Sequence, residues 1–170
     1  RKPAVYWKDS TSYGDNVGRL GLRLAGVNAH EFNDITHAYG ATYFGRLLLQ
    51  RLILRVEDRY IASRSWSRPG THYTAVRSIT RHLKQGDPVT MHNNAFLGRR
   101  FACVPLSPEH YFVQATAPIN LAYRNKVPII PYTVLEEIPY ESYSLTIHEP
   151  METDPEQSLD ENIKRISLLS

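Results

Sequence analysis

Cysteine is almost absent from this sequence. The 170 residues contain a single cysteine, Cys103, which excludes both an internal disulfide framework and a cysteine-rich metal site. A chain with so few thiols favours a reducing compartment, so we expect a cytoplasmic protein.

Long apolar runs are missing as well. The sequence has no stretch of about 18 apolar residues that would span a bilayer, and it lacks the charged start and apolar centre of a signal peptide. We therefore expect a soluble chain or one that is peripheral on the inner membrane. The start at Arg1 rather than methionine leaves open an upstream segment, including a membrane anchor.

Nucleotide-binding and metal-binding motifs are also missing. Gly14, Gly18, Gly21 and Gly26 form neither the phosphate-binding loop nor the dinucleotide pattern. The seven histidines are not spaced with carboxylates as zinc ligands usually are. The sequence therefore disfavours an NTPase or a dehydrogenase and predicts no metal and no cofactor.

Positive charge is present but unevenly placed, although the net charge is only +3. Basic residues gather in the middle of the chain, whereas residues 136–161 are mainly acidic. Such asymmetry can hold an anionic partner. The alternative is that these arginines form solvated helix faces that pair with Glu57 and Asp58. The central basic residues are Arg46, Arg51, Arg55, Arg59, Arg64, Arg68, Arg77, Arg81, Lys84, Arg99 and Arg100.

Helical and strand-like patterns alternate in the second half of the chain. Residues 74–86 have a helical apolar period and a terminating glycine, 89–92 read as a buried strand, and 93–100 read as a polar loop. A helix at 116–126 and a strand at 127–135 follow. This order predicts an α/β fold with a mainly parallel central sheet flanked by helices, in one domain over 1–170.

These segments resemble the lysophospholipid-acyltransferase-like family, and most closely the bacterial lipid A biosynthesis (lauroyl/myristoyl) acyltransferases. The resemblance rests on Leu83-Lys84-Gln85-Gly86 before Val89-Thr90-Met91, on Leu121–Arg124 before Val127–Pro131, and on a closing helix at 155–166. It implies an acyltransferase-like fold. It also implies transfer of an acyl group from acyl carrier protein or acyl-CoA to a hydroxyl or amine acceptor that is lipid-like.

The same resemblance places a catalytic histidine and carboxylate at His30 and Asp34, with three intervening residues where the family has four. His30 would take the proton of the acceptor and Asp34 would orient the imidazole. Glu31 is the weaker partner because adjacent side chains point apart. The alternative role for Asp34 is an N-cap of a helix that begins near Ile35. His92 ends a predicted strand, a location suited to function.

Arg68, Arg99 and Arg100 are the predicted contacts for a phosphate-bearing donor, because guanidinium groups bind phosphate bidentately. A predicted helix at 35–61 carries leucines on one side, which we expect to face the core; a membrane-surface role is the alternative. Two other functions remain open. One is a catalytically inactive module that binds a lipid, a carrier protein or another anionic partner, and the other, less supported, is nucleic-acid binding.

Overall fold

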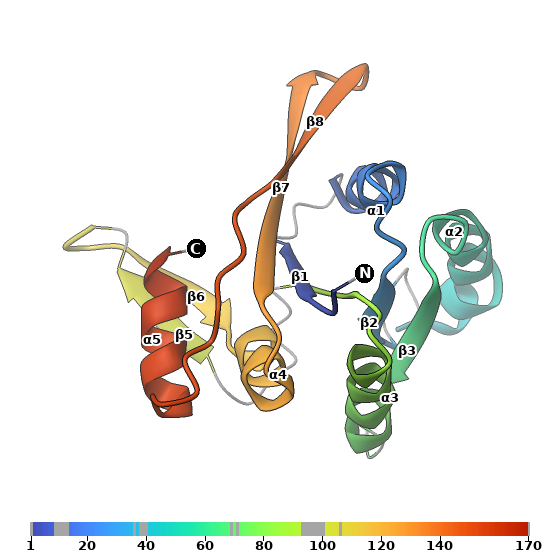
Figure 1. The fold of residues 1–170 in the computed structure, drawn as a ribbon. Helices are drawn as coiled ribbons and strands as arrows, with labels where there is room; N and C mark the ends of the chain where they lie inside the picture. The colour runs from blue at the N-terminus through green and yellow to red at the C-terminus, as the bar shows by residue number, and fades with distance from the viewer. Residues whose placement is uncertain are drawn as a thin grey trace.

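The computed structural model describes residues 2–8, 14–35, 37, 41–68, 70, 72–92, 101–105 and 107–169. Its centre is a six-stranded sheet in the order β3-β2-β4-β1-β7-β8 (Figure 1). The neighbouring strands are parallel except for the last pair. They are β1 (Val5–Lys8), β2 (His30–Asp34), β3 (Ser63–Ser67), β4 (Val89–His92), β7 (Ile129–Ile138) and β8 (Ser142–Ile147). The predicted α/β fold with a mainly parallel sheet is confirmed.

Helices cover both faces of this sheet. Helices α3 (His72–Lys84) and α4 (Ala117–Asn125) pack on one face, and α1 (Gly14–Leu24) packs on the other (Figure 1). The core lies under α3 and α4, where Val5, Val89 and Ile129 from three adjacent strands meet helix residues and are fully buried. Gly86 ends α3 with a positive φ of 89°, as the sequence predicts.

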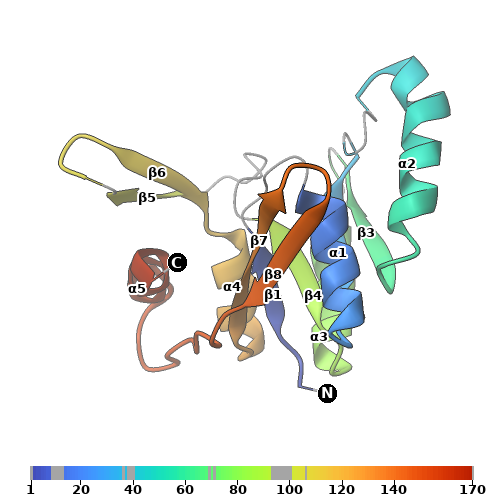
Figure 2. The same ribbon diagram turned by 90° about the horizontal axis from the view of Figure 1, so that it is seen from above.

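A second, two-stranded sheet extends from the body. It is an antiparallel ribbon of β5 (Phe101–Pro105) and β6 (Tyr111–Ala115), and α5 (Leu159–Leu169) packs against α4 and β5 (Figure 2). The sequence predicts the closing helix, but it treats residues 101–111 only as a stretch that leads to the next helix. The ribbon is therefore an addition that the apolar pattern did not indicate.

Helix α1 corrects one prediction. The approach to His30 alternates apolar and other residues like a strand, yet residues 14–24 are helical. Its buried face is formed by Gly18, Arg19 and Leu22, while Leu24 is exposed. Gly18 allows close packing, because a Cβ there would lie 3.2 Å from Tyr132. The inward face thus uses a glycine and a buried arginine, which apolar periodicity does not detect.

The segment after β2 corrects a second prediction. Instead of one helix from 35 to 61, the structure has a π-helical turn, η2 (Gly45–Leu49), followed by α2 (Gln50–Glu57). The leucine side does not face the core: Leu47, Leu48 and Leu52 are exposed by 49%, 46% and 54%. Figure 2 shows η2 and α2 standing beside the edge strand β3. The residues that this pair of helices buries include Gln50 and Glu57, which are polar.

Candidate functional site

His30 and Asp34 are not brought together by the structure. Residues 30–34 form strand β2, so the helix turn that would pair these two side chains does not exist. His30 begins the strand and Asp34 ends it, which separates their Cα atoms by about 13 Å at the usual rise per residue. The predicted pairing geometry is therefore wrong.

His30 has other neighbours, all at the amino-terminal edge of the sheet. Its Nδ1 lies 2.6 Å from the Ser63 hydroxyl, and its Nε2 lies 3.5 Å from Asp87 Oδ2. Its ring stacks on the His82 ring with 3.5 Å between centroids. Burial lowers the pKa of His30, the neighbouring His82 adds to this effect, and Asp87 opposes it. His30 is thus held in a small polar cluster.

The opposite, carboxyl-terminal edge collects different functional side chains. Lys8, His92 and Asp34 end three adjacent strands, β1, β4 and β2, and Arg68 follows β3. Lys8 is buried to 1% exposure, and the His92 side chain is 17% exposed. Ligands of open α/β sheets bind outside the carboxyl ends of the strands, so this edge is the candidate functional site.

A buried ionic cluster lies directly beneath that edge, on the sheet face that α1 covers. Arg19 of α1 donates three hydrogen bonds to Glu31 of β2, of which the two shortest are Nη2–Oε1 at 2.6 Å and Nε–Oε2 at 3.0 Å. Its Nη1 donates to Glu57 of α2 at 3.1 Å. Arg64 of β3 donates to the other Glu57 oxygen at 2.9 Å and to Asn33 at 2.9 Å. Four charged side chains, each 5% exposed or less, therefore tie four elements together.

The cluster keeps its carboxylates ionised. Burial alone would raise the pKa of Glu31, but the His92 hydrogen bond and the Arg19 charge outweigh it and hold the pKa well below its usual range. Burial also acts to raise the pKa of Glu57, and there the His37 hydrogen bond and the Arg19 and Arg64 charges reverse it. The site therefore contains two fixed negative charges beneath its surface.

One of these carboxylates, Glu31, contacts a histidine. Glu31 points to the face opposite His30, and its Oε1 lies 3.4 Å from Nε2 of His92. The second ring nitrogen, Nδ1, is buried, so it reaches an acceptor only when the ring or the groups around it move. A histidine with a fixed carboxylate on one ring nitrogen is the arrangement that general-base catalysis needs. The strand-end location of His92 was the only sign of this pair in the sequence.

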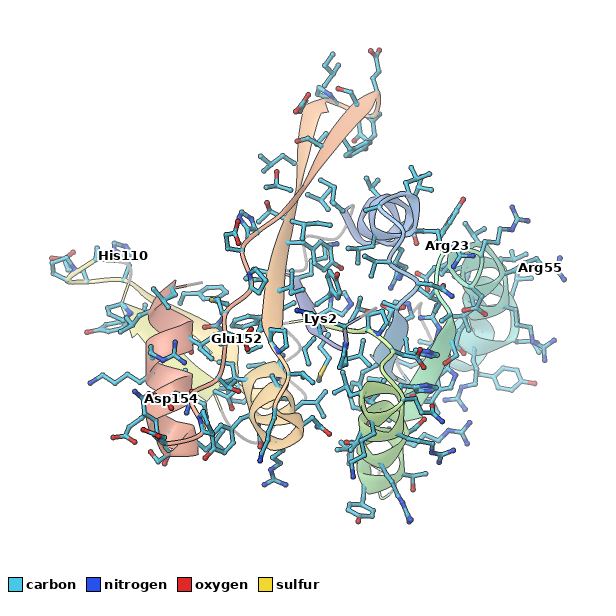
Figure 3. The ribbon with its side chains drawn as sticks, viewed as in Figure 1. Lys2, Arg23, Arg55, His110, Glu152 and Asp154 are labelled. Carbon is cyan, nitrogen blue, oxygen red and sulfur yellow. The ribbon has the colours of Figure 1, made fainter. Side chains whose placement is uncertain are left out.

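Of the three arginines predicted to bind the donor, the structure describes only Arg68. Arg68 lies exposed just after the carboxyl end of β3, whereas Arg99 and Arg100 lie outside the described residues. Among the central arginines, Arg64 pairs with both Glu57 and Asp58, but it does so in the interior rather than on a solvated helix face. Arg55 extends from α2 away from the body (Figure 3).

Comparison with known proteins gives a match in structure only. No protein-family model and no curated protein sequence matches the chain. Its fold is similar to the crystal structure of the 1-acyl-sn-glycerophosphate (LPA) acyltransferase PlsC from Thermotoga maritima, with a TM-score of 0.51 and 16% sequence identity. The match covers 98% of this chain and 66% of that protein, so the chain spans just under two thirds of its length. The chain therefore shares the fold of that protein over nearly all of its own length.

Within the described part of the chain, no helix has the length and apolar content needed to cross a membrane.

Proposed function

We propose that this chain is an acyltransferase domain that moves an acyl group from a thioester donor, acyl carrier protein or acyl-CoA, to a hydroxyl or amine on a lipid-like acceptor. The observation that carries the proposal is the His92–Glu31 pair at the carboxyl edge of an acyltransferase-like fold. The resemblance of residues 83–131 to lipid A acyltransferases supports a lipid acceptor.

The proposed chemistry is direct transfer. The neutral His92 imidazole takes the proton from the acceptor as its oxygen or nitrogen attacks the thioester carbonyl. Glu31, whose charge Arg19 and Arg64 fix in place, accepts a hydrogen bond from the other ring nitrogen and stabilises the imidazolium that forms. The thiol then leaves with a proton. His30 as the general base, without the pairing to Asp34 that the extended strand prevents, is the rival assignment, and it is tested in the same assay.

The test is transfer of a labelled acyl group from acyl carrier protein and from acyl-CoA to a panel of hydroxyl and amine lipids. Turnover with at least one donor and acceptor pair is expected. If every pair is inactive while the folded protein still binds donor or lipid, the chain is the inactive binding module instead.

Arg68, Arg99 and Arg100 are proposed to bind the phosphates of the donor. Replacing Arg99 and Arg100 together with alanine should raise the donor KM by at least about 100-fold, because each of the two charge-assisted hydrogen bonds contributes about 1.5–3 kcal/mol and about 1.4 kcal/mol is a tenfold change. Arg68→Ala should give a smaller increase. Arg124, exposed in the last turn of α4, is the matched control, and Arg124→Ala should leave KM unchanged. An unchanged KM in the double variant would remove this pair from the site.

The exposed apolar side of η2 and α2 is proposed to contact the surface of an anionic membrane. Leu48 and Leu52 are half exposed, and Arg51 and Arg55 lie beside them in solvent. An apolar stripe flanked by arginines is typical of helices that lie in the interface. Leu48→Glu with Leu52→Glu should weaken binding to phosphatidylglycerol vesicles more than about tenfold, since burial of one leucine contributes about 1.5–3 kcal/mol.

Vesicle flotation of the folded variant measures that change. Leu135→Glu on β7, which is 62% exposed, is the matched control and should float like the native chain. Equal flotation of the native chain and the double variant would show that this side does not bind the membrane.

A further inference from the structure

Three metal-binding side chains meet at the amino-terminal edge of the sheet, away from the proposed acyl-transfer site. They are His30 at the start of β2, His82 in the last turn of α3, and Asp87 in the turn that leads to β4. One ligand atom from each lies within 4.8 Å of the others. His30 is far in the chain from His82 and Asp87, which is why motif spacing did not reveal the cluster.

The backbone holds these residues in place. The left-handed Gly86, with a φ of 89°, turns the chain out of α3. The Asp87 amide then donates to the His82 carbonyl at 3.0 Å, and the His30 amide donates to the Pro88 carbonyl at 2.9 Å. The backbone of each ligand is therefore anchored by main-chain hydrogen bonds, so only the side chains need to adjust when an ion binds.

Each histidine of the cluster has one ring nitrogen that is available to an ion. The Ser63 hydroxyl lies 2.6 Å from Nδ1 of His30, which leaves Nε2 directed toward Asp87. A hydrogen-bond partner on the non-ligating nitrogen is usual for metal-bound histidines. Nδ1 of His82 is buried, and among the described residues it has no hydrogen-bond partner. A buried nitrogen without a partner is rare and points to a missing ligand.

The ligand separations suit zinc. Tetrahedral Zn²⁺ with nitrogen and oxygen ligands at about 2.0–2.2 Å places neighbouring ligand atoms about 3.4 Å apart. Here Asp87 Oδ2 lies 3.5 Å from Nε2 of His30 and 3.7 Å from Nδ1 of His82. The two imidazoles are stacked, so binding requires one ring to turn out of the stack.

We propose that His30, His82 and Asp87 form a binding site for a divalent cation of the zinc type. Two imidazoles and one carboxylate supply three ligands, and water completes the tetrahedron because the Asp87 side chain is 41% exposed. The ion would connect the start of β2 to the α3–β4 turn and so stabilise the folded chain. The Ser63 hydroxyl, hydrogen-bonded to Nδ1 of His30, would hold the His30 ring in place.

The test is titration of metal-free, tag-free protein with ZnCl2 alone. Calorimetry measures the stoichiometry and affinity, and thermal unfolding measures the change in Tm. One Zn²⁺ per chain and a rise in Tm are expected. His82→Gln and Asp87→Asn should each lower the affinity by more than about 100-fold, since even the loss of a supporting partner costs about 10–100-fold. Circular dichroism at low temperature checks that both variants fold.

The matched control is His110→Ala. His110 lies at the tip of the β5–β6 ribbon, remote from the sheet edge (Figure 3), and its loss should leave both the stoichiometry and the Tm shift unchanged. The proposal is overturned if native protein binds no stoichiometric Zn²⁺, or if the folded His82→Gln and Asp87→Asn variants bind it as tightly as the native chain does. Neither result depends on acyl transfer, so the two proposals stand or fall separately.

Discussion

Replacement of His92 by alanine is expected to lower acyl-transfer turnover by about 10²–10⁴-fold, the usual effect of losing a general base. The imidazole contacts the ionised Glu31 carboxylate at 3.4 Å and ends β4 at the carboxyl edge. In the proposed mechanism, His92 is the group that takes the proton of the acceptor as the thioester is attacked. Initial rates at saturating donor and acceptor measure the effect, because they report kcat rather than binding.

His30→Ala is the control that separates the two histidines. His30 lies at the other end of the sheet and on the other face, so this variant should retain most of its turnover at equal folded concentration. Full activity of His92→Ala with loss of activity in His30→Ala would reject the His92 assignment and restore His30.

Glu31→Ala is expected to lower the free energy of unfolding by about 3–5 kcal/mol, because it leaves buried positive charge without its partner. Arg19 makes its shortest contact with Glu31, at 2.6 Å, and Arg64 lies 3.3 Å from the same carboxylate. Neither guanidinium can reach water without moving α1 or β3, since both side chains are at most 5% exposed. Urea unfolding monitored by circular dichroism measures the loss.

Two comparisons test whether the loss comes from unpaired charge. Glu137→Ala, at an exposed position on β7, should change the stability by less than about 0.5 kcal/mol. The double variant Arg19→Ala with Glu31→Ala should lose less than the sum of the single variants, because residues in one network are coupled. Additive losses, or a cost below about 1 kcal/mol for Glu31→Ala, would show that the cluster does not stabilise the fold in this way.

The buried ionic cluster could not be predicted from the sequence. Arg19, Glu31, Glu57 and Arg64 are separated by up to 45 positions in the chain (64 − 19 = 45), and each looks like an ordinary surface charge in its own segment. Only the parallel register of β2 with β3 and the packing of α1 and α2 on one side bring them together. Charge alone carries no sign of burial, so the pattern of arginines suggested solvated helices or an anionic partner.

The leucines of η2 and α2 were predicted to face the core, and this prediction was wrong for a different reason. Apolar periodicity indicates that a helix has an apolar side, but it does not say what that side contacts. Here the polar Gln50 and Glu57 bond inward, Gln50 to the His37 carbonyl at 2.8 Å and Glu57 to Arg19 and Arg64. Their partners fix the rotation of the helix, and the leucines are turned to solvent.

The sequence by itself determined four elements in the second half of the chain. A helix with a glycine stop, the strand 89–92, the helix near 117–125 and the strand from 129 are local patterns, set by side-chain spacing and turn residues that need no distant partner. Their alternation was enough to indicate a parallel sheet.

Only the tertiary structure decided which side chains form the candidate functional site. The extended conformation of β2 separates His30 from Asp34, and the order β3-β2-β4-β1, which places β2 beside β4, brings Glu31 to His92. Contacts between strands depend on register and sheet order, which are long-range properties that no single segment encodes.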